Sequence, residues 1–350
     1  MGLIRILFIA DTHLGLDLPF RPRIKRRRRG PDFFANFKRA LEPGFSREVD
    51  AVVHGGDILY RSKVPARLVE MAFDPLKQVA NSGVPVYLVP GNHERSAIPY
   101  GHLAAHPDIH LFDRPRTYRL NTANGSLALA GFPFIRTGIR SNFLKQVART
   151  GWQDVKADAY VLCIHQSVDG AVVGPSGYMF RYAHDVIRTG DIPHGFAAVL
   201  AGHIHRFQVL DRDLEGKTLN APIFYPGSIE RISFAEREES KGYLILEFDA
   251  HHRSATALSN WRFHRLPVRP MLQLDLHAGG MPAPQIRFWL QSRLFEIPAD
   301  SVVKLKVHGH LTTEALAVFR APELRALAPE TMNIDAILVD YAYYSNRRKT

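Results

Sequence analysis

Short hydrophobic runs recur through the first part of the chain, separated by segments of helical or loop character. They occupy residues 3–10, 51–53, 84–89, 127–130, 160–164 and 197–200. Runs of this length between glycine, proline and polar residues are typical of buried strands. Between the first two runs, hydrophobic residues recur at helical spacing from Phe33 to Leu41, behind the helix-start signal Pro31-Asp32. This alternation predicts an α/β fold built in layers.

The pattern changes after residue 206, where strand-like runs follow one another closely with turn residues between them. The runs are 207–210, 223–225 and 242–248. We expect them to be antiparallel strands that complete a second sheet. The fold predicted for residues 1–265 is therefore a two-sheet β-sandwich flanked by helices.

Proline and glycine punctuate the chain beyond residue 265, which indicates a domain boundary. The residues concerned are Pro267, Pro270, Gly279, Gly280, Pro282 and Pro284. Beyond the boundary, the pattern predicts strands at 271–276, 302–307 and 337–341 and helical segments at 283–295 and 313–327. Residues 266–345 are predicted to form a small second α/β domain.

Length and composition fit a globular protein without a membrane span. The chain has 350 residues, of which 46% are hydrophobic, enough for one large core and a smaller appended one. No hydrophobic run approaches the roughly 20 residues that a spanning helix needs. The first run ends on Asp11 and His13 instead of a cleavage site, so we read it as a core strand and not as a signal peptide. Cys163 is the only cysteine and lies in a hydrophobic run, which predicts a core residue and a cytoplasmic protein.

The charge balance favours polyanionic partners. Lysine and arginine number 45 against 34 acidic residues, a formal charge of +11, which suits nucleic acid or anionic lipid. The excess is densest in Arg21, Arg23, Lys25, Arg26, Arg27, Arg28 and Arg29. Because this segment follows Asp11 and His13 closely, we expect Arg26, Arg27 and Arg28 to contact a phosphate backbone. Tyr178, Phe180, Arg181 and Tyr182 either stack on bases or pack their own loop.

Several of the predicted strands end in residues that bind metals. These residues are Asp11, His13, Asp57, Asn92, His165, His203 and His205. The ligand crevice of an open α/β sheet lies at the carboxyl ends of its strands, so we expect these side chains to converge. Alternation along an extended chain predicts that Asp11 and His13 point to one side and Thr12 to the other. A single aspartate at the end of a strand more often caps a turn than binds a metal ion. A metal site is favoured here because the other six candidate ligands also lie at strand ends.

In chain order these residues form the blocks Asp-x-His, Gly-Asp, Gly-Asn-His-Glu, a lone histidine and Gly-His-x-His. This series resembles the calcineurin-like metallophosphoesterase superfamily. The resemblance implies a binuclear centre in which Asp57 bridges two divalent metal ions. It assigns Asp11, His13 and His205 to one ion and Asn92, His165 and His203 to the other. Manganese is implied by the resemblance, and the donor set of imidazole, carboxylate and amide leaves iron and zinc open.

The same resemblance gives neighbouring residues their roles. His93 is not needed as a ligand and would protonate or hydrogen-bond a phosphate oxygen in the transition state, while the metal ions activate water. From the residues alone, apart from the resemblance, we expect Glu94 to orient its loop and His54 to be a packed or partly exposed histidine and not a ligand.

Three further features resemble SbcD-type exonuclease subunits of DNA repair. They are the opening Asp-Thr-His-Leu-Gly at 11–15, the segment from Tyr225 to Arg231 with Glu238 and Lys241 after it, and the small C-terminal domain. The resemblance implies a DNA exonuclease or endonuclease with a DNA-binding capping domain, in a family where homodimers are common. Candidate substrate contacts are Tyr60, Arg26, Arg27, Arg28 and Arg181.

Two departures from this pattern keep alternatives open. Tyr60 stands where the nucleases carry a histidine linked to exonuclease action, and tyrosine is a poor acid near neutral pH. The residues before Thr350 leave little room for the helical segment that binds a coiled-coil ATPase, so that partner stays open. A phosphatase or phosphodiesterase acting on nucleotides or other small esters, and a non-catalytic DNA-binding repair scaffold, are the alternative functions.

Overall fold

A computed structural model of the chain describes residues 2–22, 26–94, 105–252 and 256–339. The chain divides into two compact units, the first made of Met1–Leu18 and Arg29–Val268 and the second of Pro19–Arg28 and Arg269–Thr350. None of the helices within the described ranges combines the length and the hydropathy that crossing a bilayer requires.

The first unit contains two sheets of six strands each. The first sheet runs in the order β16 (Leu258–Arg265), β15 (Gly242–Phe248), β1 (Ile4–Ile9), β2 (Ala51–His54), β3 (Val86–Leu88) and β4 (Ile109–Leu111). The second runs in the order β13 (Gln208–Arg212), β14 (Thr218–Tyr225), β12 (Phe196–Gly202), β7 (Ala159–His165), β6 (Gly125–Gly131) and β5 (Arg116–Thr122). Strands β1, β2, β3 and β4 are parallel, as are β6, β7, β12 and β14.

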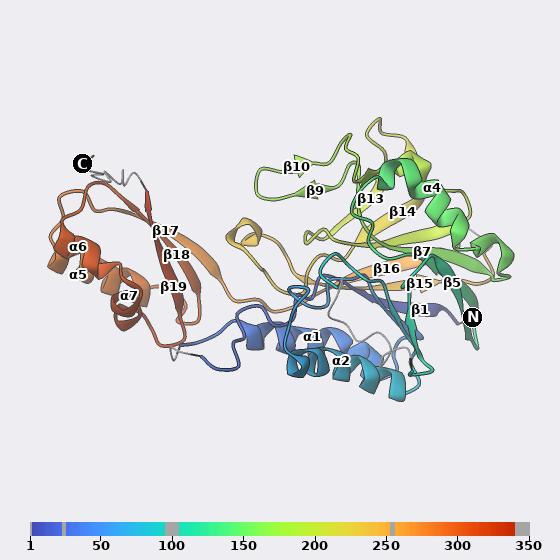
Figure 1. Ribbon diagram of the computed structural model, residues 1–350, viewed down its shortest axis with the longest axis horizontal. Coiled ribbons are helices and arrows are strands. Elements are labelled where there is room, and N and C mark those ends of the chain that lie inside the picture. The colour runs from blue at the N-terminus through green and yellow to red at the C-terminus, as the bar shows by residue number, and fades with distance from the viewer. Residues whose placement is uncertain (1, 23–25, 95–104, 253–255, 340–350) are drawn as a thin grey trace, which may run out of the picture. The chain divides into compact units, whose positions relative to one another are not determined.

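Helices cover the outer faces of both sheets (Figure 1). They are α1 (Gly30–Phe45) and α2 (Ala66–Asn81) on the first sheet and α4 (Ile139–Arg149) on the second. Alternation along β1 divides its side chains between two cores: Ile6 and Phe8 face the second sheet, while Leu7 and Ile9 pack under the helices. The result is a four-layer αββα sandwich, and Cys163 is buried between its sheets.

Shorter elements complete the first unit. The strands are β8 (Ser167–Val168), β9 (Val172–Val173), β10 (Tyr178–Met179) and β11 (Val186–Ile187), and the 3-10 helices are Trp152–Asp154, Thr189–Asp191 and Phe234–Glu236.

The strands expected after residue 206 do not all join the second sheet. Strand β13 is antiparallel to β14, but β14 is parallel to its other neighbour, β12. Strand β15 pairs with β1 in the first sheet, so the prediction for 242–248 is wrong. The spacing of hydrophobic residues along a segment predicts that the segment is a strand, but it does not predict which strand it pairs with.

The second unit has its own core around a three-stranded parallel sheet. Its strands are β17 (Met271–His277), β18 (Val302–His308) and β19 (Asn333–Val339), and its helices are α5 (Ala283–Phe295), α6 (Thr313–Val318) and α7 (Ala321–Leu327). The single helical segment expected at 313–327 is two helices, because Pro322 begins a new one. The last strand begins earlier than expected, and residues 340 and 341 of the predicted strand lie outside the described residues.

Part of the arginine-rich segment belongs to this second unit. Asn333 Nδ2 donates to the Arg27 carbonyl at 2.9 Å, and Arg26 and Arg27 line a cavity of about 510 Å³ together with Arg325. The chain therefore leaves the first unit after Leu18 and returns at Arg29. Arg23 and Lys25 lie outside the described residues.

Candidate metal centre

The candidate ligands lie at or just beyond the carboxyl ends of parallel strands. Asp11 and His13 follow β1, Asp57 follows β2 and Asn92 follows β3. In the second sheet His165 ends β7, and His203 and His205 follow β12. The two sheets thus bring together residues that lie 192 positions apart in the chain, since hydrogen bonds join residue 11 to residue 203 and residue 13 to residue 205.

Four of the ligands have left-handed backbone conformations. The φ angles are 51° at Asp11, 43° at His13, 53° at Asp57 and 92° at His203. The strand alternation that we expected between Asp11 and His13 is therefore wrong, because both residues lie beyond the end of β1. Non-glycine residues adopt such angles at a cost in free energy, typically where a functional side chain must be placed.

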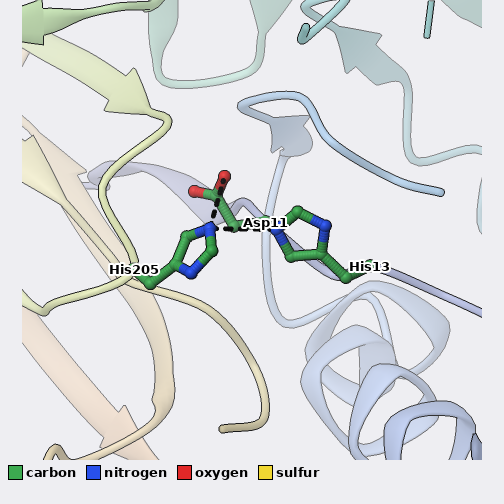
Figure 2. Close-up of side chains that lie close together, drawn as sticks. All are labelled: Asp11, His13 and His205. Carbon is green, nitrogen blue, oxygen red and sulfur yellow. Dashed lines mark hydrogen bonds and ion pairs between the residues drawn. The ribbon is translucent and has the colours of Figure 1, made fainter. Parts of the chain in front are cut away.

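One cluster joins Asp11, His13 and His205 (Figure 2). The Nε2 atoms of the two histidines are 3.0 Å apart, and His205 Nε2 lies 3.9 Å from Asp11 Oδ1. The His203 backbone N–H donates to both oxygens of Asp11, at 3.2 and 3.0 Å, which fixes the carboxylate. All three side chains direct ligand atoms to one point.

The second cluster joins Asp57, His165 and His203, with Asn92 beside it. His165 Nε2 is 3.5 Å from Asp57 Oδ2, and Asn92 Oδ1 lies 3.2 Å from His165 Nε2 and 2.9 Å from His203 Nδ1. Asp57 also shares a third cluster with His13 and His93. Its carboxylate is therefore within reach of both groups of ligands.

This donor set fits two divalent cations. Nitrogen and carboxylate oxygen atoms gather within 4.8 Å of one another in each cluster, and none of the candidates is a cysteine. Burial lowers the pKa of His13 below its usual range and that of His203 to about 3, so both imidazoles are neutral and have a lone pair for a metal ion. Burial alone would raise the pKa of Asp57, but the neighbouring His165 lowers it, so this carboxylate is ionised.

Two glycines allow the loops to approach so closely. Gly56 has a φ of 102°, and a Cβ there would overlap His165 Nδ1 and the Val89 carbonyl. A Cβ on Gly91 would overlap the Asp57 carboxylate. The turn at Gly56 is therefore also a close approach between the two sheets.

Two buried groups outside the ligand set hold these loops. The Glu94 carboxylate accepts hydrogen bonds from the backbone N–H groups of Asp57 at 2.8 Å, Gly91 at 2.7 Å and Leu59 at 3.1 Å. Glu94 therefore connects the loop of Asp57 to the loop of Gly91. The sequence predicted only that Glu94 orients its own loop, and not this contact with the Asp57 loop. His54 is completely buried, and its Nε2 atom lies 3.1 Å from the hydroxyl of Thr12. Thr12 stands between the ligands Asp11 and His13 in the sequence.

His93 lies at the open side of the site with one ring nitrogen engaged. Nδ1 donates to the Tyr60 carbonyl at 2.7 Å, and the His93 backbone N–H donates to Asp57 Oδ1 at 2.9 Å. Nε2 lies 3.8 Å from Asp57 Oδ2, and the side chain is 32% exposed. Tyr60 thus contacts His93 through its backbone carbonyl group. Nothing in the sequence indicated a contact through the backbone, because any residue type has this carbonyl.

The other candidate substrate contacts are at the surface. Arg181 and Tyr182 are exposed, and Tyr182 lies 4.4 Å from the Arg140 guanidinium, measured to the ring centroid. Arg26 and Arg27 are exposed and Arg28 is half-buried, all in the second unit.

The family model for calcineurin-like phosphoesterases matches residues 4–207. The chain belongs to this family. The matched region of the calcineurin-like domain begins with β1 and contains every candidate ligand from Asp11 to His205.

Relatives of this phosphoesterase bear the name DNA double-strand break repair protein Mre11. The Aeropyrum pernix protein is 27% identical over 79% of this chain and 64% of its own length, and the Haloferax volcanii protein is 27% identical over 92% and 66%. The Archaeoglobus fulgidus protein is 24% identical over 91% of this chain and 70% of its own length. The chain thus spans slightly less than two thirds of the first two relatives.

Proposed function

We propose that the chain is a binuclear metal-dependent phosphodiesterase that cleaves DNA, as an exonuclease or endonuclease of the repair type. The observation that carries this proposal is the position of Asp57 between two ligand clusters. Membership of the calcineurin-like family and the names of the relatives support it. We assign Asp11, His13 and His205 to one metal ion and Asn92, His165 and His203 to the other, with Asp57 shared.

The protein's own groups position the phosphodiester and supply a proton. Two divalent cations held by these seven side chains would supply the Lewis acidity that activates water and neutralises phosphate oxygens. The Tyr60 carbonyl holds Nδ1–H of His93, which leaves Nε2 directed towards the site. When the ring is protonated, Nε2–H donates to a phosphate oxygen in the transition state and later protonates the leaving oxygen. We propose manganese as the metal, with iron and zinc as alternatives.

The charge and the exposed aromatic residues suit DNA as the substrate. The net charge is +11, and Arg26, Arg27 and Arg325 line one cavity of the second unit, the proposed DNA-binding capping domain at 266–345. On the first unit, the side chains of Tyr178 and Tyr182 are 60% and 75% exposed. The Arg140 guanidinium lies 4.4 Å from the ring centroid of Tyr182, and Arg181 precedes Tyr182 in the sequence. By resemblance we also propose a homodimer, and a coiled-coil ATPase partner stays an open alternative. From the single cysteine we propose a cytoplasmic location.

Cleavage by protein stripped of metal and reloaded with manganese tests the function. The substrates are labelled single- and double-stranded DNA and a bis-aryl phosphodiester. We expect hydrolysis by the wild type, a loss of at least about 100-fold in Asp57→Asn and His93→Ala, and no change in the control His194→Ala, an exposed histidine. Inertness of the wild type with every divalent metal would overturn the proposal. Turnover of small esters alone would replace DNA as the substrate, and DNA binding without hydrolysis would favour a scaffold.

A further inference from the structure

A completely buried lysine lies behind one of the metal-ligand histidines. Lys241 immediately precedes β15, and its side chain has no exposed surface. Nζ lies 2.7 Å from Glu236 Oε2 and 3.0 Å from Glu239 Oε2, and it donates to the His205 carbonyl at 2.9 Å. A buried ammonium is costly unless it is paired, and these three oxygens provide the pairing.

Glu236 connects this lysine to the imidazole of His205. Its Oε1 atom lies 3.1 Å from His205 Nδ1, while Oε2 accepts from Lys241 and from the Ile232 backbone N–H at 3.2 Å. An ionised carboxylate only accepts hydrogen bonds, so His205 Nδ1 must carry a proton. Nε2 is then the ligand atom, and it is this nitrogen that lies 3.0 Å from His13 Nε2.

Lys241 and Glu236 therefore fix both ends of one ligand. The lysine holds the backbone carbonyl of His205, and the carboxylate holds its ring. The other cluster is held differently: His165 Nδ1 donates to the neutral Gly55 carbonyl at 2.6 Å, and His203 directs Nδ1 to Asn92. Within the described residues, His205 is the ligand histidine whose second nitrogen faces a carboxylate from outside the site.

We propose that Glu236 and Lys241 are positioning residues that set the metal affinity of the Asp11–His13–His205 site and leave the other site unaffected. A carboxylate behind a ligand histidine fixes its tautomer and orientation and increases its basicity, and loss of such a partner typically weakens metal binding about 10- to 100-fold. The inference rests on the proposed two-metal centre. It makes the two metal sites inequivalent.

Calorimetric titration of metal-free protein with Mn²⁺ tests the inference, with Glu236→Gln as the variant and Glu247→Gln as the control. Glu247 lies on β15 in an ion pair with Arg5 of 3.0 Å, at the opposite end of β1 from Asp11. We expect two binding events in the wild type and the control, and a loss of about 10- to 100-fold in one event alone in Glu236→Gln. Equal weakening of both events, or binding like that of the control, would overturn the inference while leaving the proposed function intact. A wild type that binds no manganese would overturn the metal centre, and the inference with it.

A melting curve of metal-free Glu236→Gln shows whether this variant folds. If it does not fold, a measurement on the wild type tests the contact between Glu236 and His205 instead. Nitrogen-15 spectra of histidine in zinc-loaded protein distinguish a protonated from a metal-bound ring nitrogen. We expect His205 to keep its proton on Nδ1 and to bind zinc through Nε2. Binding through Nδ1 would contradict the proposed contact with Glu236.

Discussion

Replacing Thr12 by valine removes one hydroxyl group from a buried chain of hydrogen bonds between two ligand loops. The Gly56 backbone N–H donates to His54 Nδ1 at 3.1 Å, so the proton of this imidazole is on Nε2. Nε2–H then donates to Thr12 Oγ1 at 3.1 Å, and the hydroxyl donates to the Ile58 carbonyl at 3.1 Å. Burial lowers the pKa of His54 to about 3, which keeps the ring neutral.

The expected loss of stability follows from the one hydrogen-bond donor that is left without a partner. Valine has nearly the shape of threonine, and Thr12 and His54 are completely buried, so water cannot replace the hydroxyl without rearrangement. The Ile58 carbonyl keeps the hydrogen bond that it accepts from the Leu14 backbone N–H at 2.8 Å, so Thr12→Val leaves one buried donor, His54 Nε2–H, unsatisfied. An unsatisfied buried donor costs about 1–3 kcal/mol. The control Thr12→Ser keeps the hydroxyl and loses one methyl group, about 1 kcal/mol.

Native-state hydrogen exchange at the amides of β1 and β2 measures this difference, because these strands report on the first unit alone. We expect the free energy of opening to be about 1 kcal/mol lower in Thr12→Val than in Thr12→Ser. Equal values in the two variants would refute the derived direction of the hydrogen-bond chain.

Three further outcomes are expected. Burial raises the pKa of Glu230 from 4.5 to about 7, so the folded state loses stability as the pH rises from about 5 to about 7. Denaturation curves should therefore show that Glu230→Gln raises the free energy of unfolding, relative to the wild type, by about 2 kcal/mol more at pH 8 than at pH 5. An equal effect at the two pH values would contradict this. Gly56→Ala should weaken Mn²⁺ binding more than about 10-fold, since its Cβ meets a ligand imidazole, whereas Gly83→Ala, also at positive φ but in open space, should leave binding unchanged. The double variant Arg26→Ala with Arg27→Ala should reduce the slope of log affinity for DNA against log salt by about 2, and an unchanged slope would exclude these arginines as phosphate contacts.

The convergence of the ligands could be predicted from the common edge at which parallel strands end, but the geometry within the first ligand loop could not. Parallel strands end at a common edge of their sheet, which suffices to bring Asp57 and Asn92 together. The alternation expected for Asp11 and His13 fails because both residues lie past the end of β1, at positive φ. The two side chains nevertheless lie in one cluster with His205.

Contacts between distant segments could not be read from local pattern. Three glutamates precede Lys241 within a few residues, and nothing in their spacing distinguishes Glu236, which is buried, from Glu238, whose side chain is 84% exposed. Hydrophobic period likewise did not show that β15 joins the first sheet, or that Pro19–Arg28 joins the second unit.

The most direct test of the metal centre is anomalous diffraction from crystals of the protein grown with manganese. We expect two anomalous peaks, one contacted by Asp11, His13 and His205 and one by Asn92, His165 and His203, with the Asp57 carboxylate in contact with both. A single peak, or a peak that Asp57 does not contact, would contradict the proposed two-metal centre.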